Sequence, residues 1–87
     1  MEKIYLVIRN YSCESSGNID IQNIYVFKNY KDAEICFLRE KQEIKSYNLG
    51  YSEVEEKNDY YCEYENGEYL YYHELVYIEE KEVVSYE

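Results

Sequence analysis

One amphipathic helical segment stands between two groups of strand-like segments, and this order restricts the fold more than any other feature of the sequence. Asn29 is a favoured helix N-cap residue, and Asp32, three residues later, can complete a capping-box-like exchange with it. The following residues are good helix formers, and apolar side chains recur among them at helical spacing. These side chains form one stripe, widened by Cys36: Ala33, Phe37, Ile44 and Tyr47.

The charged residues of this segment are expected on its outer surface. Glu40 with Ile44, and Lys41 with Lys45, are neighbours one helical turn apart that are expected on the outer face. Asn48 and Gly50 then accept the left-handed conformation with which many helices end. The sequence therefore predicts a helix that ends just before these two residues.

Two strand-like runs precede the helix. Lys3–Arg9 is a nearly continuous apolar run rich in β-branched residues, which favours a strand buried on both faces near the centre of a sheet. Ile19–Phe27 first alternates apolar and polar residues and then becomes wholly apolar. The polar segment between the two runs contains a glycine and is expected to be a loop.

Three further strands are expected after the helix. Tyr51–Glu56 is a weak strand, followed by a turn at Lys57–Asp59. Tyr60–Glu65 and Glu68–Ile78 then flank Asn66-Gly67. This dipeptide is the strongest indicator of a two-residue hairpin, because both positions of that turn need positive φ.

The predicted fold class is α+β, as a single domain over residues 1–87. It has an antiparallel sheet of about five strands, in the order β-β-α-β-β-β, with one helix packed on one face. The residues after Glu79 either extend the last strand or fray. The sequence does not decide which face the helix covers.

A two-residue turn would place Glu65 opposite Glu68 and Tyr60 opposite His73. Because strand side chains alternate, one face of this ribbon is then uncharged and is expected to pack toward the helix. That face consists of Tyr60, Cys62, Tyr64, Tyr69, Tyr71, His73, Leu75 and Tyr77. The other face is acidic and is expected to face water; it consists of Asp59, Tyr61, Glu63, Glu65, Glu68, Tyr72 and Glu74, with Leu70, Val76 and Ile78.

The acidic residues are concentrated in the second half of the chain. Residues 1–49 carry seven acids and seven bases, whereas residues 50–87 carry twelve acids and two lysines, so this half holds the whole net charge of −10. Like charges directly opposite on a ladder destabilise a sheet by a few tenths to about 1 kcal/mol per pair. A fold that tolerates this repulsion presents an acidic surface suited to a basic partner.

Such a carboxylate array imitates the charge of a nucleic-acid backbone, which proteins bind with lysine and arginine. Tyrosines between the acids offer ring faces on which arginine side chains stack. The predicted partner-binding residues are Glu55, Glu56, Asp59, Tyr61, Glu63, Glu65, Glu68, Tyr72 and Glu74, with Tyr61 and Tyr72 as the stacking anchors. The alternative is a solvated sheet face in a protein whose acidity serves solubility.

No catalytic, cofactor-binding or metal-binding residues are predicted. His73 has no serine or cysteine nucleophile at a recognisable spacing, and the neighbouring acids Glu55–Glu56 and Glu79–Glu80 lie in no calcium-loop pattern. The three cysteines are odd in number and form no C-x-x-C motif, so we expect reduced, mostly buried thiols. With no apolar run of about 18 residues and no signal-peptide pattern, the sequence indicates a cytosolic protein.

The chain resembles small proteins of phages and low-GC bacteria. The resemblance lies in K-I-Y-L-V-I over Lys3–Ile8, in I-Y-V-F-K-N-Y-K-D-A-E over Ile24–Glu34 and in a tyrosine-rich closing strand, none of which carries catalytic residues. In size, charge and aromatic content the chain is also similar to phage-encoded anti-defence proteins of the anti-CRISPR type. Several such inhibitors insert an acidic surface into the nucleic-acid channel of a CRISPR nuclease. The resemblance implies the same activity here, in the host cytosol.

The predicted function is therefore non-enzymatic inhibition of a basic nucleic-acid-binding protein, a CRISPR effector nuclease, without direct contact with nucleic acid or membrane. A second hypothesis is a homo-oligomeric phage or mobile-element accessory or scaffold protein, a homodimer included. Its self-association surface would be formed by exposed tyrosines and an edge at Val76–Ile78. A third hypothesis is sequestration of a small ligand in a tyrosine-lined pocket.

Overall fold

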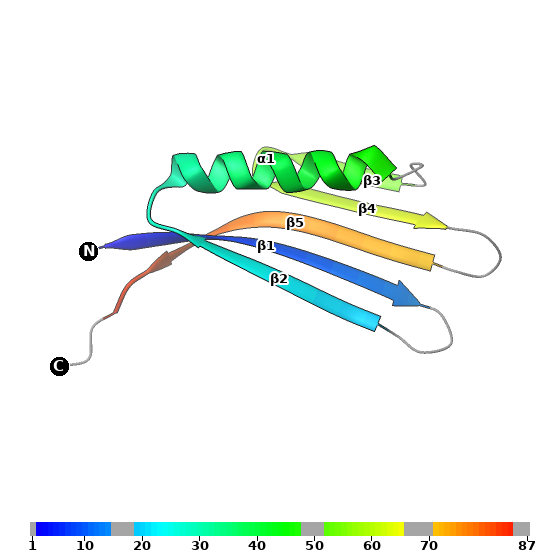
Figure 1. The fold of residues 1–87 in the computed structure, drawn as a ribbon, viewed down its shortest axis with the longest axis horizontal. Coiled ribbons are helices and arrows are strands. Elements are labelled where there is room, and N and C mark those ends of the chain that lie inside the picture. Colours follow the sequence, from blue (N-terminus) through cyan, green and yellow to red (C-terminus); the bar gives the residue numbers. More distant parts are fainter. Residues whose placement is uncertain (1, 15–18, 48–51, 66–70, 85–87) are drawn as a thin grey trace.

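Five strands and one helix are formed by the residues that the computed structural model describes, 2–14, 19–47, 52–65 and 71–84. They are β1 (Lys3–Glu14), β2 (Ile19–Phe27), α1 (Tyr30–Tyr47), β3 (Ser52–Glu56), β4 (Asp59–Glu65) and β5 (Tyr71–Glu82). The strands form one antiparallel sheet in the order β2-β1-β5-β4-β3, and α1 runs along one face of it (Figure 1). The predicted α+β fold and its element order are confirmed.

The start of α1 follows from its capping residue. The Asn29 side-chain oxygen accepts a hydrogen bond from the Asp32 backbone N–H at 2.9 Å, and the Asn29 amide donates to the Asp32 carboxylate at 2.9 Å. The Ala33 N–H donates to the Asn29 carbonyl at 3.4 Å, which closes the first turn. The predicted N-cap is therefore confirmed, whereas the predicted helix exit at Asn48 and Gly50 lies outside the described residues.

The core lies between α1 and the sheet. The predicted stripe residues Ala33, Phe37 and Ile44 are fully buried. The sheet contributes the other buried members of the cluster: Val7, Tyr60, Cys62 and Val76. Burial of an apolar side chain of this size stabilises a fold by roughly 1.5–3 kcal/mol, so this single layer is the main source of apolar stabilisation.

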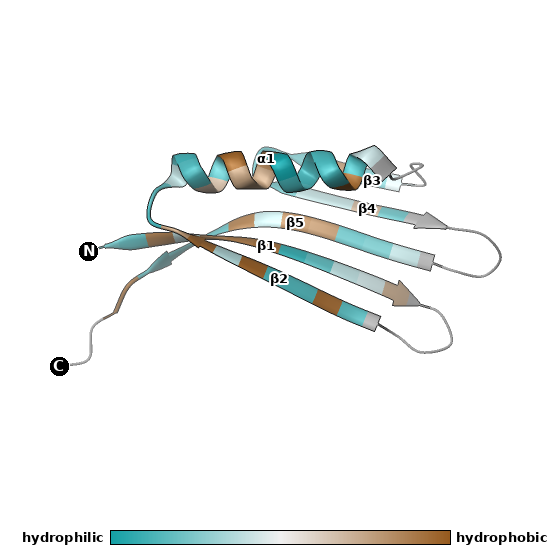
Figure 2. Ribbon diagram, in the orientation of Figure 1, coloured by the Kyte–Doolittle hydropathy of each residue, from teal (hydrophilic) through white to brown (hydrophobic). Residues whose placement is uncertain are grey.

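The other face of the sheet, which we call the open face, is not covered by α1 (Figure 1). The molecule measures 54 × 25 × 15 Å, a thickness that fits one helix on one sheet. Its radius of gyration of 15.1 Å exceeds the value of about 12 Å typical of a compact chain of this length. Hydrophobic bands recur along β2 (Figure 2), and its register with β1 places Ile21 on the helix side but Ile24 and Val26 on the open face.

The hairpin of β4 and β5 differs in register from the prediction. Tyr60 lies opposite Val76 and Glu63 lies opposite His73, so β5 is displaced by three residues from a two-residue turn. The last described pair, Glu65 and Tyr71, leaves five residues between the strands, and Asn66-Gly67 itself is outside the described residues. Because three is odd, the displacement exchanges the two faces of β5.

Two further expectations about position are wrong. Val76–Ile78 is not at an edge, because β5 is the middle strand of the sheet and Val76 is in the core. Glu40 does not lie on the outer surface of α1; it is buried, since it follows the stripe residue Phe37 by three positions. The central position of β1 is correct: Val7 and Ile8 point to opposite faces and both are buried.

Within the described residues, no helix combines the length and the apolar character needed to cross a membrane.

Candidate interaction surface

The open face carries an acidic end on β3 and β4. Glu56 and Asp59 are exposed and lie directly opposite each other beside the turn that joins these strands. Tyr61 and Glu63 are half-buried and follow Asp59 on the same face, because every second residue of a strand shares a face. We call Glu56, Asp59, Tyr61 and Glu63 the acidic patch.

Among the described residues, no lysine or arginine relieves the repulsion between Glu56 and Asp59. In the described part of the chain, neither Glu56 nor Asp59 forms an ion pair with lysine or arginine. Opposed side chains on a ladder have Cβ atoms roughly 5 Å apart, and two like charges there destabilise by roughly 0.2–1 kcal/mol. The fold retains this repulsion at an exposed site, where an external cation would relieve it.

Three side chains order the far end of the acidic patch. The Tyr61 hydroxyl donates a hydrogen bond to Glu63 Oε1 and lies 2.8 Å from His73 Nδ1, which is itself 3.9 Å from Glu63 Oε1. The prediction placed His73 on the helix side, but the shifted register places it on the open face. These contacts connect β4 to β5 and hold the Tyr61 ring in one position.

The middle of the open face is apolar. Its side chains come from β1, β2 and β5: Leu6, Ile8, Ile24, Val26, Leu75 and Tyr77. Ile24 and Val26 are exposed, whereas Ile8 is buried by its neighbours within the face. An apolar region bordered by charges is the usual composition of a protein-binding surface.

Three of the predicted partner-binding residues lie on the helix side instead. Glu55 is held by Lys41 and Lys45 of α1, each with its Nζ 2.8 Å from a Glu55 oxygen. Hydrogen bonds from these two lysines lower the pKa of Glu55 to about 2, so its charge is already compensated. Tyr72 packs against Tyr11 with ring centroids 5.7 Å apart, and Glu74 is buried.

The acidic surface in the structure is therefore smaller than the acidic face that was predicted. The structure brings together Glu56, Asp59, Tyr61 and Glu63, but not Glu55, Tyr72 or Glu74. The prediction for Glu65 falls on a side chain that is not described, and Glu68 lies outside the described residues.

Glu74 belongs to a charge cluster between α1 and the sheet that the sequence prediction missed. Arg9 Nη1 lies 2.5 Å from Glu40 and 3.3 Å from Glu43, and Arg9 Nη2 lies 3.3 Å from Glu74. Glu43 is exposed, while the other three side chains are largely buried. Glu40 also raises the pKa of the Tyr25 hydroxyl, by its charge and by a hydrogen bond. The position of Arg9 in its strand could have indicated this cluster. Arg9 follows the core residue Val7 by two positions, so both side chains point to the same face of β1.

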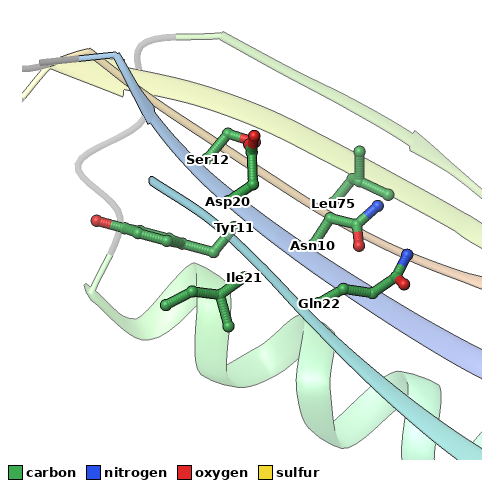
Figure 3. Close-up of a pocket in the computed structure, with 7 residues that line it drawn as sticks. All are labelled: Asn10, Tyr11, Ser12, Asp20, Ile21, Gln22 and Leu75. Atoms are coloured by element: carbon green, nitrogen blue, oxygen red, sulfur yellow. The ribbon is translucent and has the colours of Figure 1, made fainter. Parts of the chain in front are cut away.

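A surface hollow of about 350 Å³ lies beside the C-terminal end of β1 and the N-terminal end of β2 (Figure 3). It is lined by Asn10, Tyr11, Ser12, Asp20, Ile21, Gln22 and Leu75. The Ser12 hydroxyl donates to Asp20 at 2.6 Å, so these two groups satisfy each other. Among the described residues, Tyr11 is the one tyrosine of this lining. Burial, and then the proximity of Tyr72, raise the pKa of Tyr11.

The three cysteines form no disulfide within the described parts of the chain. Cys13, Cys36 and Cys62 are free thiols, and burial raises the pKa of Cys62 to about 11. No three described histidine, cysteine, aspartate or glutamate side chains are arranged to hold a metal ion.

A comparison of this chain with protein-family models, with curated proteins and with solved structures finds no match.

Proposed function

We propose that this protein is a non-enzymatic inhibitor whose acidic patch occupies the basic nucleic-acid groove of a partner protein. The observation that supports the proposal is the Glu56 and Asp59 pair, which has no lysine or arginine partner among the residues described, with Tyr61 and Glu63 beside it on the open face. A CRISPR effector nuclease in the host cytosol is the partner class to test first, because it combines a basic groove with a nucleic-acid ligand that carboxylates can imitate.

The distribution of charge over the sheet supports a directional interaction. Residues 52–65, which include β3 and β4, carry six acids and one lysine. β2, at the opposite edge, carries one acid, Asp20. A basic groove is therefore attracted to the β3–β4 end, and the gradient orients the protein as it approaches.

The neighbouring apolar region supports a protein as the partner. Leu75 and Tyr77 of β5 are half-buried and lie directly opposite Tyr61 and Asp59 of the acidic patch. An inhibitor that competes with nucleic acid gains affinity from dry apolar contact as well as from charge. The proposed interface therefore extends from the acidic patch toward the middle of the open face.

The test measures competition with DNA. A fluorescent DNA duplex bound to a purified CRISPR effector nuclease is titrated with the full chain, at about 50 mM and about 200 mM salt. The variant Glu56→Gln/Asp59→Asn/Glu63→Gln removes the charge of the acidic patch. The control Glu2→Gln/Glu80→Gln/Glu82→Gln removes the same charge from exposed positions outside the patch.

We expect the patch variant to compete about tenfold less well at low salt, from roughly 0.5 kcal/mol for each of three exposed ion pairs. Its competition should also depend less on salt, while the control should stay within about twofold of the unmodified chain. Equal losses in both variants would show that only net charge matters. A panel of effector types against which the unmodified chain never displaces DNA would refute the proposed partner class.

A further inference from the structure

The two edges of the sheet differ in a way that points to a second interface. β2 forms one edge, and all nine of its residues pair with β1, from Tyr5 opposite Phe27 to Cys13 opposite Ile19. Among the described residues, no strand pairs with its other side. The outer edge of β2 therefore presents a row of backbone groups available for hydrogen bonding to another strand.

The other edge is protected against such pairing, and β2 is not. β3 has five residues, all exposed, and three of them are glutamates. Short length and charge are the usual means by which proteins block an edge strand. β2 has nine residues, no proline, one acid at Asp20 and an uninterrupted register with β1. Its sequence permits the addition of another strand.

The side chains of β2 also favour a covered edge. Exposed apolar residues lie on both of its faces: Ile21 (51%) and Tyr25 (38%) on the helix side, and Ile24 (52%) and Val26 (61%) on the open face. A groove of about 310 Å³ between α1 and β2 adds Ile35, which is half exposed, and Phe27. A strand added to β2 would cover these apolar surfaces on both sides of the sheet.

We propose that β2 pairs antiparallel with β2 of a second copy of this chain, about a two-fold axis at Asn23. Asn23 is the midpoint of Ile19–Phe27, so this register pairs the full length of both strands. It places Ile21 of each copy opposite Tyr25 of the other, which is a favourable aromatic–aliphatic pair. The product is one ten-stranded sheet with the helices of both copies on the same face.

The distribution of acidic residues is compatible with a second copy of this chain at the β2 edge. Two chains of net charge −10 repel each other, and they can approach only where acids are few. Across a β2–β2 junction, the two β4 strands lie seven strand spacings apart, or about 34 Å at 4.8 Å each, well beyond the Debye length of about 8 Å. The two Asp20 side chains are six residues apart along the strands, about 20 Å.

The first test is sedimentation of the full chain alone, from about 1 μM to 1 mM, in about 0.15 M and 1 M salt. We expect a monomer–dimer equilibrium that strengthens at high salt, because screening reduces the repulsion between the copies. Competition with DNA at the acidic patch weakens with salt, so the two interactions respond in opposite directions. The dimer proposal does not rest on the proposed function, and a monomer at every concentration and salt would overturn the dimer proposal alone.

The second test locates the interface. Asn23→Lys and Asn23→Asp change the net charge in opposite directions, but each places two like charges face to face on the axis. Both should weaken the dimer, by about 1.5- to 5-fold for one opposed pair. A stronger dimer for Asn23→Lys would show that only net charge matters and would overturn this register.

Cross-linking supplies an independent measurement of the register. Opposed Cα atoms of antiparallel strands lie about 4.5–5.5 Å apart, within the range that a disulfide bridges. In a Cys36→Ser background, Asn23→Cys should give a covalent dimer on mild oxidation. Val54→Cys on the opposite edge is the control and should stay monomeric. Cross-linking through position 54 in place of position 23 would overturn the proposal.

Discussion

Replacement of Arg9 by methionine should destabilise this protein more than any change on its surface. Arg9 lies between β1 and α1, with Glu40 at 2.5 Å and Glu74 at 3.3 Å. The side chains of Arg9, Glu40 and Glu74 are 12%, 11% and 2% exposed, so water cannot replace the guanidinium. Arg9→Met keeps an unbranched apolar stem, removes the guanidinium and leaves two carboxylates in the core region without this cation.

The size of the effect follows from that burial. Removal of one partner of a buried ion pair costs about 3–5 kcal/mol, because a charge stays behind without compensation. The whole free energy of unfolding of a chain of 87 residues is about 4–13 kcal/mol. Arg9→Met should therefore remove a large part of it. Glu43→Gln is the matched control and should lose less than about 1 kcal/mol, since Glu43 is 58% exposed.

Urea unfolding followed by circular dichroism measures these differences. With a slope of about 1.5 kcal/mol per molar urea, the midpoint of Arg9→Met should fall by about 2–3 M. Should that variant not fold, Arg9→Met/Glu40→Met/Glu74→Met decides the question. Apolar replacement of a whole buried charge cluster is neutral or stabilising by about 1–4 kcal/mol, so the triple variant should fold. A triple variant no more stable than Arg9→Met, or a loss below about 1 kcal/mol in Arg9→Met, would refute this reasoning.

Two further predictions concern titratable groups. Lys41 and Lys45 lower the pKa of Glu55 from 4.5 to about 2 in the folded protein, so these ion pairs stabilise the fold above pH 4.5 and lose their effect as the pH falls through 2. Urea midpoints measured between pH 5 and pH 2 should therefore fall less in Glu55→Gln than in the unmodified chain. Identical acid profiles would contradict the ion pairs. Burial raises the pKa of Cys62 to about 11, so at pH 8 about one molecule in a thousand carries the thiolate. Iodoacetamide labelling read by mass spectrometry should modify Cys62 only at the rate of unfolding, and rapid labelling without denaturant would contradict its burial.

The helix shows where prediction from sequence works and where it fails. The Asn29 cap and the stripe of Ala33, Phe37 and Ile44 were predicted correctly, because both depend on residues within a few positions of each other. Glu40 was placed on the wrong side because its partner, Arg9, is 31 positions away in the sequence. A charged residue is predicted to be exposed, even beside an apolar stripe, unless its buried partner is known.

The hairpin shows how one local feature decides many positions. Asn66-Gly67 indicated a two-residue turn, and every face assignment on β5 depended on that turn. The actual register is displaced by three residues, so Glu74 is buried and His73 lies on the open face. The assignment of side chains to faces was therefore correct on β4, whose alternation is continuous with the core residues Tyr60 and Cys62, and wrong on β5.

The sequence by itself determined the order of the elements, the start of the helix and its buried apolar stripe, and the concentration of acids in the C-terminal half. Each of these is local, because caps, periodicity and charge counts need no knowledge of distant residues. Only the tertiary structure decided that β5 is central, that β2 is an unprotected edge, and which of the described carboxylates are paired with a cation. Strand order and register depend on contacts between segments far apart in the chain. A shift of the register by an odd number of residues moves every side chain of a strand to the opposite face.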